Sequence, residues 1–502
     1  MEDEDVVMED INKIMKNISI KTSNILNKML KKTNEKLSKF IIDDTINIKN
    51  NNNNKLLSPP PKLDIIPIYS PPQDISLTQY SILYKSRYKE SKEKLLKICK
   101  AKYKKIEYIE NILDLKGNEK KIIIGITYKE MALKPSVLKN IENILGSKKI
   151  ESFMNEDDYL CVEDLSGRIR INKELSKIKI NEICSGIPIG CIGNLDEKGL
   201  FIIDEYVFYN CDIFDINYFI SNNNINNNNG DFNFNQPENN ILLISNLSIG
   251  NPNTPFKTNY NLIISLLINF IQNIFNNNFS IEKLFLLGNN IFSPEESELV
   301  EKGSYLKQDL NNRVYNTISD NYETLDNLLK IISNFIPTYI LSSENYINSE
   351  YFPQNQINSI LFENCENLID KNLFFLNNPE YINYNNENKI LFCSGNNINN
   401  LKKITNLDEL NLIYKTLLWG HLAPNSPDTL RTFSLSKDNL IMNDIPDQFI
   451  VGNQINFNYA NVERLDKKIT SIITVPNFCE TGEVVIWNIK EKKGKVIQFN
   501  IN

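Results

Sequence analysis

The spacing of apolar residues changes from helical to strand-like within the first half of this 502-residue chain. Residues 77–112 have helical spacing, with Tyr80, Leu83, Tyr84 and Tyr88 on one face. Short apolar runs bounded by turn residues indicate β-strands, and five of them follow, at 121–128, 159–164, 168–171, 186–193 and 200–208. This order predicts a helix and then a small barrel, either a Greek-key barrel of the OB type or a generic antiparallel one.

Beyond an Asn-rich break at residues 221–240, apolar strand-like runs alternate with helical stretches. Fully apolar strands separated by helices predict an α/β layered domain. Three further runs near the end predict a closing antiparallel set. The whole chain is therefore predicted to be an α+β multidomain protein. The predicted strands are 241–245, 284–287, 338–341, 390–393 and 449–451, the helices are 261–275, 324–334 and 407–419, and the closing runs are 470–475, 484–489 and 495–499.

Proline and asparagine tracts set the predicted boundaries. Residues 1–72 end in two proline-rich motifs, and because proline fixes φ and removes a donor, we expect a disordered tail and linker there. A weakly amphipathic stretch inside this tail is a frayed segment in the interpretation that we favour, and a partner-binding helix in the alternative. The predicted domains are 73–220 for the helix and barrel, 221–240 for an Asn-rich linker and 241–502 for the layered domain.

Charge and residue counts exclude several classes of function. The chain has 55 Lys and Arg residues against 62 Asp and Glu residues, a formal net charge of −7, which disfavours a general polyanion binder but leaves room for a local basic patch. The single histidine, His421, excludes a multi-histidine metal centre. The eight cysteines form no CxxC pair and are typical of reduced core residues in an intracellular protein. The acidic start argues against a secretory peptide, and the longest apolar stretch, 260–275, is too short for a membrane span.

Ligands of α/β sheets bind at the carboxyl ends of strands, and this chain places mostly small and amide residues there. Glu344 alone among these candidates is ionisable, and one carboxylate makes neither an acid/base pair nor a dinuclear metal site. Gly, Ser and Asn at strand ends are also ordinary turn residues. We therefore predict no catalytic residue, no metal and no cofactor at this edge. The candidate positions are Ser245, Leu247, Asn289, Glu344, Asn345, Asn453 and Ile455.

The order of these strand ends resembles the ligand blocks of calcineurin-like phosphoesterases with the ligands replaced. Ser245 and Leu247 stand where Asp and His would be, and Asn289 replaces Asp. Glu344 and Asn345 fall in the third block, and the last two histidines are replaced as well. A barrel followed by such a degenerate domain is similar to the B subunits of eukaryotic replicative DNA polymerases. Asn453 and Ile455 occupy those last two histidine positions.

Within that family the sharper similarity is to the second subunit of DNA polymerase delta. The segments that carry it are 132–138, 160–164 with 168–171, 199–206 and 473–478, and the most specific is the loop His421-Leu-Ala-Pro-Asn-Ser-Pro-Asp-Thr-Leu430. The similarity covers about residues 77–500. His421 in this tight loop is better explained as a structural histidine bonded to backbone than as a ligand or base. The signature residues of the loop are His421, Pro424, Pro427, Asp428 and Leu430.

The resemblance implies an OB-type barrel followed by a calcineurin-like phosphoesterase α/β sandwich that lacks metal ligands. It implies a non-catalytic accessory subunit in the nucleus, acting in DNA replication and repair synthesis. Its expected partners are the cysteine-rich carboxyl-terminal module of the catalytic subunit of polymerase delta and a third small subunit. DNA would be contacted only through the complex, and no membrane is involved.

Three alternatives stay open at this point. The first is a B subunit of DNA polymerase alpha or epsilon, which the loop at 421–430 disfavours. The second is a working metal-dependent phosphodiesterase, which the histidine count disfavours. The third is direct single-strand binding by Arg168, Arg170, Tyr206 and Phe208 of the barrel, which the crowding of acidic residues on the same strands disfavours.

Overall fold

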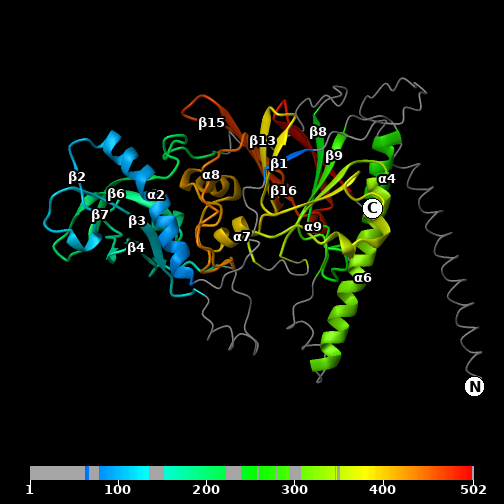
Figure 1. Cartoon of the computed structure of the whole chain (residues 1–502), viewed down its shortest axis with the longest axis horizontal. Helices are drawn as coiled ribbons and strands as arrows, with labels where there is room; N and C mark the ends of the chain where they lie inside the picture. The colour runs from blue at the N-terminus through cyan, green and yellow to red at the C-terminus, as the bar shows by residue number, and fades with distance from the viewer. Residues whose placement is uncertain are drawn as a thin grey trace, which may run out of the picture.

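The computed structural model describes residues 63–66, 79–134, 152–221, 239–256, 259–276, 281–292, 307–344, 346 and 351–499. They form a barrel and a two-sheet sandwich that lie side by side (Figure 1). Most of the predicted tail and of the Asn-rich linker lies outside the described residues, so the predicted domain boundaries stay predictions. Among the described residues, no helix combines the length and the apolar character needed to cross a membrane.

The barrel confirms the five predicted strands. They pair in the order β5-β4-β3-β6-β7, with β2 on β3, and an isolated bridge between Ile171 and Phe201 links the end of β5 to the start of β7. Helix α2 covers the outside through Leu95 and Cys99, which pack on Ile124. The elements are α2 (Tyr80–Lys102), β2 (Glu107–Tyr108), η1 (Ile112–Asp114), β3 (Lys121–Glu130), β4 (Tyr159–Glu163), β5 (Arg168–Arg170), η2 (Ile180–Glu182), β6 (Pro188–Leu195) and β7 (Phe201–Phe208).

The first sheet of the sandwich has the order β11-β10-β9-β8-β17-β18. Strands β8 to β11 run parallel, and β17 and β18 add an antiparallel hairpin at the other end. Nearly every residue of β8 to β10 is buried, because both faces of the sheet are covered. The strands are β8 (Asn240–Ser245), β9 (Ile281–Leu287), β10 (Thr338–Leu341), β11 (Leu373–Leu376), β17 (Glu483–Asn488) and β18 (Lys493–Gln498).

The second sheet has the order β1-β12-β13-β14-β16-β15, with parallel pairing of β13, β14 and β16 at its centre. Its inner face packs on the first sheet, where the ring of Phe285 stacks on those of Tyr339 and Phe392 at centroid distances of 5.0 and 4.4 Å. The strands are β1 (Asp64–Ile66), β12 (Glu380–Tyr384), β13 (Asn388–Cys393), β14 (Gln448–Gln454), β15 (Asn458–Glu463) and β16 (Ile469–Pro476).

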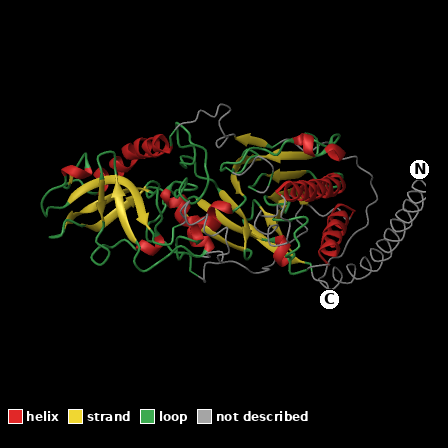
Figure 2. Ribbon diagram, turned by 90° about the horizontal axis from the view of Figure 1, so that it is seen from below, coloured by secondary structure: helices red, strands yellow, loops and turns green. Residues whose placement is uncertain are grey.

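Helices cover the outer faces of both sheets, which gives four layers (Figure 2). Helices α4, α6 and α9 share a core with the first sheet, and α7 and α8 share one with the second. The core under α8 continues into the interior of the barrel. The helices are α4 (Tyr260–Asn276), α6 (Lys307–Ser333), α7 (Asn396–Lys402), α8 (Glu409–Trp419) and α9 (Phe478–Thr481), with short turns η5 (Ser359–Leu361) and η6 (Glu363–Cys365).

The structure adds strands β11, β12 and β15, which were not predicted, and begins α6 at Lys307, well before the predicted helix 324–334. Two further departures concern strand pairing. The three closing runs do not form one antiparallel set, because β16 lies in the second sheet while β17 and β18 pair in the first. Residues 64–66, which were assigned to the disordered tail, form β1 and pair with β12. Both differences come from pairing partners that are distant in sequence, which local hydrophobic patterns do not reveal.

Candidate functional site

The carboxyl ends of strands from both sheets meet at one edge of the sandwich. The Ser245 hydroxyl, at the end of β8, donates to the Leu287 carbonyl at 2.9 Å and accepts from the backbone N–H of Asn453 at 2.7 Å. The backbone N–H of Asn289 donates to the Ser343 hydroxyl at 2.7 Å. Three of the predicted positions, Ser245, Asn289 and Asn453, therefore belong to a hydrogen-bonded seal at this edge. The Ser245–Asn453 bond joins the two sheets, and the Asn289–Ser343 bond joins the ends of β9 and β10 within the first sheet.

Glycines allow these strand ends to approach closely. A Cβ atom on Gly452 would lie 2.6 Å from the Ser245 hydroxyl and 2.9 Å from the Cβ of Leu287. A Cβ atom on Gly288 would lie 2.6 Å from the Cβ of Ser394. The two sheet edges thus leave no room for larger side chains at these points.

Backbone conformation explains the amides at the strand ends. Asn246, Asn289 and Asn453 have φ values of 57°, 43° and 53°, in the left-handed region that most residues avoid. Asparagine enters this region more easily than other non-glycine residues, because its short side chain can hydrogen-bond locally. The Nδ2 of Asn246 donates to the Oδ1 of Asn453 at 3.2 Å. These amides therefore have a structural reason to be here.

The structure does not bring the other candidates into the same seal. Leu247 is fully buried in the core of the first sheet, whereas Ile455 is 61% exposed. Glu344 is exposed, and Asn345 lies outside the described residues. Within the described part of the chain, no three His, Cys, Asp or Glu side chains gather closely enough to hold a metal ion.

A second polar cluster lies where α2 and the barrel meet the loop at residues 421–430. His421 is fully buried, its Nε2 lies 3.0 Å from the Oδ2 of Asp438, and its Nδ1 accepts from the backbone N–H of Ala423 at 3.1 Å. These contacts fix the neutral tautomer with the proton on Nε2. Burial, together with the neighbouring Arg87, lowers the pKa of His421 and keeps the ring neutral.

Arg87 of α2 joins three parts of the molecule at this point. Its Nε donates to the Oδ2 of Asp438 at 2.6 Å, and its Nη1 donates to the carbonyls of Pro424 at 2.6 Å and Gly186 at 3.1 Å. Its Nη2 donates to the Ser426 carbonyl at 3.2 Å. Burial opposes ionisation of Asp438, but the charge of Arg87 outweighs it and holds the pKa of that carboxyl below its usual range.

We call the side chains of Arg87, Asp438 and His421 the seam cluster. Arg87 and Asp438 were absent from the sequence prediction. The available signal was a cation between Leu83 and Tyr88, on the apolar face of a predicted helix. Such a cation is buried only when it is paired.

The remaining signature residues also support this seam. Asp428 accepts from the Lys134 ammonium group at 2.6 Å and from the Tyr84 hydroxyl at 3.4 Å. Leu430 is buried in the core that the barrel shares with α8. Pro424 is buried and Pro427 is half-buried. The loop is thus a connector between α2, the barrel and the sandwich.

The four barrel residues considered for single-strand binding make contacts within the barrel. The half-buried ring of Tyr206 packs edge-on against Phe208 at a centroid distance of 5.4 Å. The guanidinium carbon of Arg168 lies 4.0 Å from the ring centroid of Tyr128, and its side chain forms an ion pair with Glu163. The guanidinium carbon of Arg170 lies 3.9 Å from the ring centroid of Tyr159. Phe208 is 2% exposed, so its ring offers no stacking surface.

Comparisons with known proteins match both parts of the chain. A family model described as the DNA polymerase delta subunit OB-fold domain matches residues 79–206. A second family model, that of the DNA polymerase alpha/epsilon B subunit, matches residues 241–459.

Full-length relatives agree with these matches. The chain is 24% identical over 434 residues to a DNA polymerase delta small subunit of Oryza sativa subsp. japonica, covering 84% of this chain and 93% of the rice protein. It is 24% identical over 483 residues to that of Saccharomyces cerevisiae, covering 84% and 90% of the two chains. The Arabidopsis thaliana protein of the same name is 24% identical over 421 residues, with 78% and 84% covered.

Proposed function

We propose that this chain, which belongs to the family of DNA polymerase delta small subunits, is the scaffold that holds the catalytic subunit and a further small subunit in one complex. The observation that carries this proposal is the match of both the barrel and the sandwich, in the same order, to that family. One family model bears the alpha/epsilon name, but the barrel model and the relatives bear the delta name. An accessory role in polymerase delta is therefore favoured over a role in polymerase alpha or epsilon.

The seam between barrel and sandwich supports a scaffold. The segment after β7 runs along α8, where Nδ2 of Asn210 donates to the Leu417 carbonyl at 2.9 Å and the Tyr414 hydroxyl donates to the Asp215 carbonyl at 2.5 Å. The seam cluster adds the buried ion pair of Arg87 with Asp438 and the hydrogen bond of neutral His421 to Asp438 at another point of the same seam. A platform that is rigid before binding loses less entropy when a partner docks.

The chemistry of the strand ends supports a non-catalytic role. Metal-dependent hydrolysis needs several anionic or imidazole ligands that converge on the metal, and here Glu344 is exposed while serines and asparagines tie the strands together. We interpret the sandwich as a calcineurin-like phosphoesterase domain without its metal ligands. The rival interpretation, a working phosphodiesterase, predicts Mn²⁺-dependent nuclease activity that survives repurification and that Glu344→Ala abolishes. Our proposal expects only background nuclease activity from the unmodified chain and from the Glu344→Ala variant.

Partner binding provides the direct test. We place the partners in the nucleus, in replication and repair synthesis, and the receiving surface for the catalytic subunit's cysteine-rich carboxyl-terminal module along the barrel–sandwich seam. We expect DNA to be contacted only through the complex, because a net charge of −7 disfavours direct binding to the phosphate backbone. Co-expression with that module should raise the melting temperature of this chain, since a ligand that binds only the folded state stabilises it. An unchanged melting temperature, with no co-elution on a sizing column at micromolar concentration, would reject the proposal.

A further inference from the structure

An exposed apolar surface straddles the seam at the start of α2. We call it the aromatic ledge and define it as Tyr80, Ile82, Tyr351, Phe433 and Leu435. Tyr80, Ile82 and Tyr351 are 41%, 39% and 42% exposed. The rings of Tyr351 and Phe433 lie 5.3 Å apart, and the Tyr80 hydroxyl donates to the Thr432 carbonyl at 2.9 Å. The ledge thus joins the helix of the barrel part to two segments of the sandwich.

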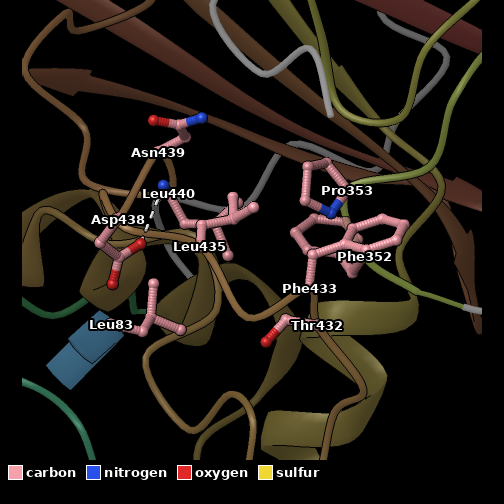
Figure 3. A pocket seen from close by; sticks show the side chains of 9 residues that line it. All are labelled: Leu83, Phe352, Pro353, Thr432, Phe433, Leu435, Asp438, Asn439 and Leu440. Atoms are coloured by element: carbon pink, nitrogen blue, oxygen red, sulfur yellow. Dashed lines mark hydrogen bonds between the residues drawn. The ribbon is translucent and has the colours of Figure 1, made fainter. Parts of the chain in front are cut away.

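A shallow hollow opens between these segments (Figure 3). Leu83 of α2 lines it together with Phe352, Pro353 and Leu440. Thr432 also lines it, and its hydroxyl oxygen is buried without a hydrogen-bond partner among the described residues. A buried polar group without a partner costs free energy, so this wall of the hollow is incompletely satisfied in the free chain.

The surroundings of the hollow are cationic. Lys85 of α2 and Arg431 and Lys437 of the adjoining loop are exposed. Glu344 lies within electrostatic range of Arg431 and offsets part of this charge. Asp438 lines the hollow, but its charge is already balanced by Arg87. The rim is therefore net positive on a chain whose formal charge is −7.

We propose that the aromatic ledge docks a segment of another polymerase subunit that carries an aromatic or branched apolar side chain flanked by acidic residues. This inference rests on the proposed function and names the chemistry of one of its interfaces. Aromatic side chains surrounded by a polar rim are typical of the energetic centre of protein interfaces. The acidic flanks complement Lys85 and Lys437. The apolar side chain at the centre distinguishes this partner from nucleic acid, whose phosphates could also complement the lysines but which offers no branched apolar side chain. Because the occupant would contact both α2 and the sandwich, its binding depends on the orientation of the barrel on the sandwich, which the seam cluster fixes.

Photocrosslinking in the assembled complex tests the position of the ledge. The full chain, with p-benzoylphenylalanine in place of Tyr351, is co-expressed with the other polymerase delta subunits. The control carries the same probe in place of Ile360, which is 74% exposed and lies off the ledge. We expect a crosslink from position 351 to an apolar segment of another subunit with acidic neighbours, identified by mass spectrometry. A crosslink to a second copy of this chain, or to residues 67–78 of the same chain, overturns the inference.

Affinity measurements test its chemistry. Tyr351→Ser should weaken binding of the other subunits about tenfold or more, as expected for an interface centre. The double change Lys85→Glu and Lys437→Glu should weaken binding and reduce its salt dependence, whereas Lys371→Glu, an exposed lysine away from the ledge, should leave both unchanged. If no subunit co-purifies with the unmodified chain, the proposed function and the ledge both fail. If the subunits co-purify but position 351 gives no crosslink and these variants bind normally, only the ledge fails.

Discussion

The Arg87→Met substitution tests whether the seam cluster holds the barrel against the sandwich. Methionine keeps much of the side-chain volume but removes the charge and every donor. The Asp438 carboxylate then keeps the His421 contact at 3.0 Å and the backbone N–H of Leu440 at 3.1 Å, both of them neutral groups. The carbonyls of Gly186, Pro424 and Ser426 lose their shared donor. The substitution thus leaves a buried carboxylate without its cation.

The expected loss of stability is large. Removing one partner of a buried ion pair costs about 3–5 kcal/mol, because the remaining charge is left uncompensated. For a domain of this size, such a loss corresponds to a fall in melting temperature of about 10 °C. Adding Asp438→Asn removes the charge that Arg87→Met leaves unpaired. The stability loss of the double variant should therefore be smaller than the sum of the two single losses, by about 0.5–3 kcal/mol.

Urea unfolding followed by tryptophan fluorescence measures this cycle, since Trp419 and Trp487 are both buried in the sandwich. Hydrogen exchange at residues 185–187 and 421–430 reports separately on the seam. Lys89→Met is the matched control, because Lys89 is exposed on the same helix. A loss below about 1 kcal/mol for Arg87→Met, or strictly additive effects in the cycle, would refute a buried, coupled ion pair.

Three further predictions concern single positions. Burial, and then the nearby arginine, lowers the pKa of His421 in the folded state. The contribution of the neutral ring to stability is therefore complete above pH about 6.5. It is lost as the pH falls below that value, at up to about 1.4 kcal/mol per pH unit. In urea unfolding between pH about 5 and 7, His421→Gln should flatten this slope, and an unchanged slope would show that the ring titrates normally. Gly452→Ala places a Cβ 2.6 Å from the Ser245 hydroxyl and should lower stability by about 1–3 kcal/mol in thermal unfolding, whereas wild-type stability would mean that the strand ends are loosely joined. Gly186→Ala places a Cβ 1.8 Å from a carbonyl across the seam, at φ +85°. It should lower the free energy of unfolding by about 2–4 kcal/mol and speed hydrogen exchange at the seam. Gly199→Ala, at φ +76° in open space, is the control that isolates backbone strain.

Strands with a strong local pattern were predictable from the sequence. The five barrel runs and the central strands of the sandwich are rich in β-branched and aromatic residues, and they appear within a few residues of their predicted bounds. Strand β1 was not predictable, because three residues beside proline-rich sequence have no pattern of their own. Asp64–Ile66 form a strand only because residues Tyr381–Asn383 of β12 offer a free edge. Such pairing is a property of the folded chain.

The candidate site was predictable in composition but not in geometry. Small and amide residues at strand ends could be identified from the sequence, and the structure gives their reason in left-handed φ values and close sheet edges. Arg87 could not be assigned, because its partner Asp438 is 351 residues away along the chain. His421 was correctly expected to bond to backbone, through the N–H of Ala423, but its second contact with Asp438 was missed.

The strand ends of the sandwich and the seam between barrel and sandwich differ in their electrostatics. At the strand ends, three asparagines with positive φ hold a turn geometry that costs about 1 kcal/mol or more at each residue. Neutral hydrogen bonds of Ser245 and Asn246 with Asn453 join the two sheets there. At the seam, the single histidine of the chain, a fully buried arginine and a carboxylate with a lowered pKa are concentrated within a few contacts. Buried charges of this kind stabilise one geometry only when all partners are in place, because each charge alone is costly to bury. The buried charges of the seam cluster therefore fix the orientation of the barrel on the sandwich, which is the property that the proposed scaffold requires.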